Sequence, residues 1–208
     1  SDKSVSQAVL EKTTDTTASN PVLYNFNKPY SISVNFEKNL LSMCEGYARE
    51  ATQGLTRDYR TNCSVEFNGL IMKSFDEYHS SLPNPTCIST IALPPLKGQA
   101  LMHIDLNLAF ALVKKMLGGR TEDEDTLRRF TDIEMGIAGS IAENLLTYLK
   151  EASSKFATIS PEYLSIEANP EYLNTPATEE TMILLSFEVA IRDVKGKLTF
   201  CIPSIAFE

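Results

Sequence analysis

The sequence predicts an α/β fold in which two pseudo-symmetric halves share one largely antiparallel sheet with helices on its faces. Two observations support this prediction: a sequence repeat and a repeated order of helix and strand patterns. The segment Thr90–Gly98 matches Glu188–Gly196, about a hundred residues later, without a gap. Upstream, Ser64–Asn68 matches Ser165–Asn169 with nearly the same offset. Two copies are too few for a solenoid, but they can close one domain around a pseudo-two-fold axis.

The chain begins with a polar region that we expect to lie outside the fold. Residues 1–20 are rich in Ser, Thr, Lys and Asp and contain no aromatic residue, which is typical of a disordered tail. Tyr24 and Phe26 then lie in an extended lead-in. We therefore assign the tail and lead-in to residues 1–29 and one folded domain to residues 30–208, with halves over about 36–117 and 131–208.

Apolar periodicity and turn residues define the elements of the first half. Asp105 is positioned to cap the last helix of this half, and Gly118-Gly119 can end it in the left-handed conformation that glycine tolerates. The expected elements are a helix over about 36–55, a strand over about 63–72, a short helix over 74–81, strands over about 87–93 and 99–104, and a helix over 106–117.

The second half repeats this order after an acidic linking loop over 119–129. Thr131 and Glu134 form a capping box, and Phe130 and Met135 can form the hydrophobic staple around it. This repeated order makes chance similarity of two β-hairpins the weaker explanation of the repeat. The helix stripe is expected to comprise Ile133, Ile137, Ile141, Leu145 and Leu149, followed by strands over about 163–169, 182–191 and 197–202 and a new helix near Ser204.

The core and the cysteines follow from the same patterns. Cys44, Cys63, Cys87 and Cys201 form no Cys-x-x-Cys pair and lie in helix and strand patterns, so we expect buried thiols rather than disulfides. The residues expected to be buried are Val65, Phe67, Ile91, Ile104, Ile141, Leu145, Ile166, Val189 and Phe200.

Composition and charge limit the classes of partner. The 208 residues carry a formal net charge of −8, which argues against a nucleic-acid partner because phosphates would be repelled. No apolar run approaches the ~18 residues that span a bilayer, and no signal-peptide pattern opens the chain. The chain starts at Ser1 and stops within an apolar segment, so we expect a piece of a longer protein.

Residues that could support catalysis are sparse. The two histidines, His79 and His103, lie apart in a short helix and a strand, and neither belongs to a metal or catalytic motif. The acidic run over 122–125 is typical of a solvated loop and lacks the spacing of a calcium loop. We therefore expect no metal, no cofactor and no catalytic residue.

Six segments, in order along the chain, match motifs of one known protein family. Each is short, but together they extend over residues 23–203. They are Leu23–Pro29, similar to Tyr-Asp-Phe-x-Arg-Pro; Ser81–Thr86, similar to Ser-Leu-Pro-Asn-Pro-Thr; Met116–Gly119, similar to Leu-Leu-Gly-Gly; Phe130–Glu134, similar to Phe/Leu-Thr-Asp/Glu-Ile-Glu; Glu167–Pro170, similar to Glu-Thr-Asn-Pro; and Phe200–Pro203, similar to Phe-Cys-Ile-Pro.

Together these segments resemble the middle domain of the flagellar motor switch protein FliM family. The resemblance implies a non-enzymatic structural and switching component of the bacterial flagellar C-ring, at the cytoplasmic face of the inner membrane. It implies the duplicated α/β/α fold of the CheC and CheX phosphatases. It also implies contacts with FliG, with neighbouring FliM copies and with FliN through a C-terminal domain absent from this chain. Phosphorylated CheY would bind and bias the direction of rotation.

The resemblance places two partner sites on this sequence, and both depart from the family pattern. The FliG-binding site would comprise Leu117, Gly118, Gly119 and Arg120, but Thr121 replaces the last glycine of Gly-Gly-x-Gly. The CheY-binding site would comprise Ser6, Gln7 and Leu10, but Lys12-Thr13-Thr14 replaces the apolar end of that motif. The segment is therefore either degenerate, or the true motif lies upstream.

Two alternative functions are considered. A CheC-type phosphatase of phosphorylated CheY requires a Glu and an Asn three residues apart on a helix. Neither long helix carries such a pair: Glu45, Glu50, Glu134 and Glu143 are followed three residues on by Ala48, Gln53, Ile137 and Leu146, and Asn144 directly follows Glu143. The other alternative is an adaptor of a related type III secretion apparatus, which only a partner test would separate from a flagellar role.

Overall fold

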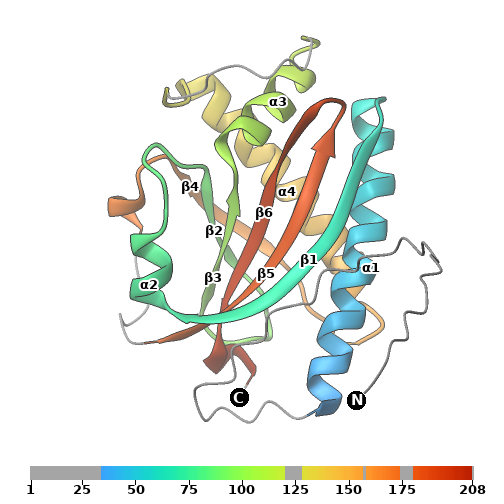
Figure 1. The fold of residues 1–208 in the computed structure, drawn as a ribbon, viewed down its shortest axis with the longest axis vertical. Coiled ribbons are helices and arrows are strands. Elements are labelled where there is room, and N and C mark those ends of the chain that lie inside the picture. The colour runs from blue at the N-terminus through green and yellow to red at the C-terminus, as the bar shows by residue number, and fades with distance from the viewer. Residues whose placement is uncertain (1–33, 120–127, 157, 174–179, 208) are drawn as a thin grey trace, which may run out of the picture.

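A computed structural model of the chain describes residues 34–119, 128–156, 158–173 and 180–207. The predicted tail and lead-in lie outside these ranges. The elements, shown in Figure 1, are helices α1 Val34–Tyr59, α2 Phe75–Ser80, α3 Leu106–Met116 and α4 Asp132–Ser153; strands β1 Cys63–Ser74, β2 Ile88–Ala92, β3 Gln99–Ile104, β4 Glu162–Glu167, β5 Thr181–Ile191 and β6 Val194–Pro203; and 3-10 turns η1 Pro170–Tyr172 and η2 Ser204–Phe207.

The six strands form one antiparallel sheet in the order β1-β5-β6-β3-β2-β4. Exchanging the two halves maps β1 onto β4, β5 onto β2 and β6 onto β3, so this order is unchanged by a two-fold axis between β6 and β3. Three of the five strand pairs, β1–β5, β3–β6 and β2–β4, join strands of different halves. The predicted fold class, with distant strands of two halves meeting in one sheet, is therefore confirmed.

The repeated Lys-Gly pairs occupy similar positions in the two halves: Gly98 directly precedes β3, and Gly196 lies near the start of β6. A Cβ added at Gly196 would lie 2.7 Å from Leu108 Cβ at the start of α3. A Cβ added at Gly98 would lie 3.2 Å from Pro203, which precedes η2. Each glycine therefore permits close approach of a segment from the other half: Gly196 to the start of α3, and Gly98 to the end of β6. In the second half, η2 begins at Ser204, where the sequence predicted a new helix and where the order of elements corresponds to the start of α3 in the first half.

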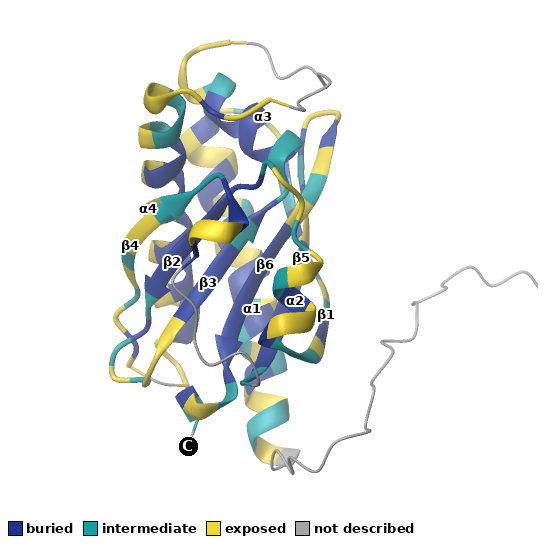
Figure 2. Ribbon diagram, turned by 90° about the vertical axis from the view of Figure 1, so that its left-hand side faces the viewer, coloured by how far each residue is buried: buried dark blue, intermediate teal, exposed yellow. Residues whose placement is uncertain are grey.

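Helices α1, α3 and α4 pack on one face of the sheet, and α2 packs on the other (Figure 1). Neighbouring residues of β3 alternate between the two layers: Met102 joins the large core under α1 and α4, and Leu101 joins a smaller cluster with Phe75 of α2. Tyr47 of α1 stacks edge-on against Phe187 at 4.9 Å. Figure 2 shows the buried residues along the central strands and the inward sides of the helices.

Most of the predicted core is confirmed, but two predicted core positions and the first residue of the predicted helix stripe differ. Val65, Ile91, Ile104, Ile141, Leu145, Val189 and Phe200 are buried, as expected. Phe67 on β1 and Ile166 on β4 are only half-buried and pack against the large core from the two edge strands of the sheet. Ile133 is 74% exposed, because the first turn of α4 extends beyond the core and the stripe enters it only after that turn.

The predicted cap of α4 is confirmed, whereas the predicted cap of α3 is not. The capping box of α4 is present: Thr131 accepts a hydrogen bond from the Glu134 N–H, and Glu134 accepts one from the Thr131 N–H. The predicted side-chain cap by Asp105 is wrong. Its carboxylate accepts instead from the Lys197 N–H at 2.8 Å, because β6 brings that donor beside it. The backbone carbonyl of Asp105 still accepts the first helical bond from Ala109.

All four cysteines are free and buried, as predicted. Within the described ranges, no helix combines the length and the apolar character needed to cross a bilayer.

Candidate functional site

The carboxyl end of α3 is closed by two backbone hydrogen bonds around a left-handed glycine. Gly118 has a φ of +80°, and its N–H donates to the Lys115 carbonyl at 3.1 Å. The Gly119 N–H donates to the Lys114 carbonyl at 2.9 Å. This pair of bonds is a Schellman motif, which requires a residue that tolerates positive φ at its first position. The expected left-handed termination by glycine is confirmed, and the positive φ lies at Gly118.

This turn presents apolar side chains and bare backbone on the surface. Leu117 is 62% exposed and Met116 is 46% exposed, and both glycines are exposed. A Cβ at Gly119 would approach the Lys114 carbonyl oxygen at 3.1 Å, so a side chain there would crowd the turn. The structure thus places three of the predicted FliG-binding residues together. Arg120 lies outside the described residues.

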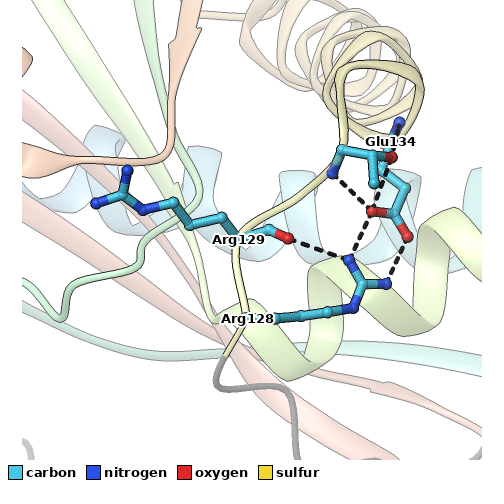
Figure 3. A network of polar contacts seen from close by, with 4 residues as sticks. Arg128, Arg129 and Glu134 are labelled. Carbon is cyan, nitrogen blue, oxygen red and sulfur yellow. Dashed lines mark hydrogen bonds and ion pairs between the residues drawn. The ribbon is translucent and has the colours of Figure 1, made fainter.

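The chain enters α4 through a dense polar network (Figure 3). Arg128 Nη1 and Nη2 donate to the two carboxylate oxygens of Glu134 at 2.8 and 2.7 Å, and Nη1 also donates to the Arg129 carbonyl. The same carboxylate accepts from the Thr131 N–H and hydroxyl. Hydrogen bonds from Arg128, and then those from Thr131, lower the pKa of Glu134 to about 2, although burial acts to raise it.

Arg128 also connects this network to α3. Its guanidinium carbon lies 4.4 Å from the centre of the Phe110 ring, a cation–π contact. Phe110 is buried in α3 and packs against Phe130 with ring centres 4.1 Å apart. Sequence reasoning found the capping box but missed Arg128, because its partners Phe110 and Glu134 belong to different helices.

The turn at the end of α3 and the start of α4 lie at the same end of the molecule (Figure 1). Both carry exposed apolar side chains: Met116 and Leu117 on α3, and Ile133 on α4. Large exposed apolar residues close to accessible backbone are typical of protein–protein contacts. The arrangement is suited to docking a protein partner.

Two pockets lie on the described part of the chain, and the second of them reaches Met116 at the end of α3. An apolar pocket of about 390 Å³ lies beside η2, where the start of α1 meets the end of α4, and only Asn39 and Ser153 contribute polar side chains to its lining. A pocket of about 350 Å³ between α1, α3 and α4 includes Asp58 and Lys115. The Asp58 carboxylate is already bound by the Tyr148 hydroxyl at 2.5 Å and by Arg57.

The groups with possible catalytic chemistry are separated in the fold. His79 Nε2 lies 2.9 Å from the Pro170 carbonyl, and burial lowers the pKa of His103 on β3. Glu134 is engaged in the cap, and Glu143 and Asn144 are exposed on α4. Across the described ranges, no three His, Cys, Asp or Glu side chains gather as a metal site would need. The predicted CheY-binding residues, Ser6, Gln7 and Leu10, lie outside these ranges.

Fold and surface together define a class: a duplicated α/β scaffold that exposes apolar side chains at the neighbouring ends of two helices. The chain belongs to the family described as flagellar motor switch protein FliM, whose model matches residues 36–208. It is 32% identical over 187 residues to FliM of Borreliella burgdorferi and 27% identical over 186 residues to FliM of Treponema pallidum, covering 89% of this chain in each case. It spans 53% and 54% of those relatives, about half their length.

Solved structures agree with this assignment. The FliM middle domain of Vibrio alginolyticus matches with a TM-score of 0.72 and 29% identity, over 81% of this chain and 95% of that one. FliM in a FliG–FliM complex from H. pylori matches with a TM-score of 0.79 and 23% identity, over 85% of this chain and 100% of that one. The second match supports the fold alone.

Proposed function

We propose that this chain is a structural and switching component of the flagellar rotor, and that it docks FliG through the turn at the end of α3. The observation that carries the proposal is the exposed Leu117 beside Gly118 and Gly119, held in one conformation by the Schellman motif. Family membership supports the choice of partner, and the H. pylori protein of the same fold was solved in complex with FliG. Arg120 would add a cation able to meet a carboxylate or carbonyl on FliG.

The remaining contacts of the proposal follow from the family. Neighbouring copies of the chain would lie beside it in the C-ring, and FliN would be held by a C-terminal domain outside this sequence. Phosphorylated CheY would bind the segment that contains Ser6, Gln7 and Leu10. The assembly would lie at the cytoplasmic face of the inner membrane as a peripheral part of the basal body.

Calorimetry with FliG from the same genome tests the docking site. Leu117→Ala and Gly119→Leu are each expected to weaken binding by ~1–3 kcal/mol, the range of a disturbed hot spot, because one removes an anchor and the other blocks approach to the backbone. Melting temperatures should change far less, since the turn lies outside the core.

Leu164→Ala is the matched control, because Leu164 is a 44% exposed leucine on the edge strand β4. It should leave FliG affinity unchanged. If Leu117→Ala and Gly119→Leu bind FliG as well as the unmodified chain does, the docking site lies elsewhere.

We also infer that the chain is not a phosphatase of phosphorylated CheY. The exposed Glu143 and Asn144 are adjacent in α4, so their side chains point about 100° apart around the helix instead of converging on one water. Mixed with phosphorylated CheY, the chain should leave the rate of phosphate loss at its spontaneous value, as followed by a dephosphorylation time course. A rate that rises with chain concentration would contradict this inference.

A further inference from the structure

Arg128 makes contacts that the cap at the start of α4 does not need. The capping box is complete with Thr131 and Glu134 alone, since each backbone N–H already has a side-chain acceptor. Arg128 adds two charge-assisted hydrogen bonds to Glu134 and places its guanidinium over Phe110. The Glu134 side chain is only 15% exposed, although that of Arg128 is 51% exposed. One residue therefore bridges the first turn of α4 and the middle of α3.

The bridge has a geometry that lysine could not reproduce. A planar guanidinium can bind both oxygens of one carboxylate and at the same time stack on an aromatic ring. Figure 3 shows the Arg128 side chain directed toward Glu134, whereas the side chain of Arg129 extends away from it. Of these two adjacent arginines, only Arg128 is directed at the Glu134 carboxylate.

We propose that Arg128 and Glu134 are a positioning pair that fixes the end of α3 relative to the start of α4 and so presents Met116, Leu117 and Ile133 as one pre-organised docking surface. The proposal rests on the docking function proposed above. A surface held in its bound arrangement avoids part of the conformational entropy that ordering on binding would cost. The pair acts on affinity without touching the partner.

The first measurement is FliG affinity by calorimetry, well below the melting temperature of each variant. Arg128→Ala should weaken binding about tenfold, within the range expected for lost pre-organisation. The affinity of Arg128→Lys should lie between those of Arg128→Ala and the unmodified chain, because lysine keeps the positive charge but cannot bind both carboxylate oxygens at once. Arg129→Ala is the matched control and should change affinity less than about twofold, the scale of a rim contact.

The second measurement needs no partner. Backbone amide exchange should become faster at Gly118 and Gly119 in Arg128→Ala, because their bonds to α3 close the turn. Amides of the central strand β5, such as that of Leu185, report global unfolding and should change less. Two results would overturn the positioning role. One is amide exchange at Gly118 and Gly119 that accelerates no more than exchange in β5, and the other is an Arg128→Ala affinity equal to that of Arg129→Ala.

If the unmodified chain fails to bind FliG, the proposed docking function is refuted. The exchange experiment still decides whether the Arg128–Glu134 pair holds the turn.

Discussion

At the scale of single residues, Glu134 contributes the most clearly separable interaction. Its carboxylate accepts hydrogen bonds from Arg128 and Thr131 while its own N–H donates to the Thr131 hydroxyl. These bonds stabilise the ionised form, so the pKa falls from an ordinary value of 4.5 to about 2. A carboxylate with a lowered pKa stabilises the folded state only while it stays ionised.

Glu134 is therefore expected to make stability depend on pH in an acidic window. Its contribution is fully present above about pH 5 and is lost as pH falls from the unfolded value near 4.5 through the folded value of about 2. Glu134→Gln should lower the free energy of unfolding by about 1–2 kcal/mol at pH 7, the range of a charge-assisted cap, and by much less near pH 2. Urea denaturation of both chains at several pH values measures the difference. A difference that stays constant from pH 7 to pH 2 would show that ionisation of Glu134 does not contribute.

At the scale of elements, α1 and α4 approach closely where a glycine meets an aromatic ring. A Cβ at Gly54 would lie 2.2 Å from Cε1 of Tyr148. Tyr148 is also held in place by its hydroxyl, which donates to Asp58 one turn further along α1. The two long helices can therefore approach this closely only because position 54 has no side chain.

Two glycine-to-alanine changes should consequently have opposite signs. Gly54→Ala should destabilise the chain by about 1–3 kcal/mol, because the added methyl group overpacks the helix contact. Gly136→Ala, in the first turns of α4 with nothing within 4 Å of the added Cβ, should stabilise it by about 1 kcal/mol through helix propensity. Chemical denaturation followed by circular dichroism measures both, and two values of the same sign would contradict the packing argument.

At the scale of the whole molecule, the two halves are interleaved in one sheet. The first strand of each half pairs with a strand of the other half, and β3 and β6 join at the centre. Burial raises the pKa of Cys63 to about 11 and that of Cys87 to about 12, and it also raises that of Cys201. A thiol attacks disulfide reagents as its thiolate, so the native thiols should react slowly.

The interleaved sheet should unfold as one cooperative unit. Cys63 belongs to the first half and Cys201 to the second, and both should become reactive at the same urea concentration at which helical circular dichroism is lost. Mass spectrometry after a pulse of thiol reagent reports each cysteine separately. Exposure of Cys201 at clearly lower urea than Cys63 would mean that the halves are independent cores.

The sequence alone determined what depends on local pattern and turn chemistry. The duplicated order of elements, the capping box at Thr131 and Glu134, and the glycine termination of α3 all follow from residues close together in the chain, because capping and turns use neighbouring backbone groups. The internal repeat also predicted that strands of distant halves would meet in one sheet. Phe67 and Ile166 were overestimated as core residues, and Ile133, the first member of the predicted helix stripe, is exposed, since a periodic pattern does not show where a sheet has its edges or where a helix extends past it.

Tertiary structure decided the contacts that join segments distant in the chain. Asp105 binds the Lys197 N–H rather than capping α3, because strand pairing delivers a donor that a local pattern cannot reveal. Arg128 bridges Phe110 and Glu134 only once α3 and α4 lie side by side. The exposed surface around Leu117 likewise became visible only in the folded chain, since exposure depends on all the segments that could have covered it, whereas periodicity reports only neighbours along one element.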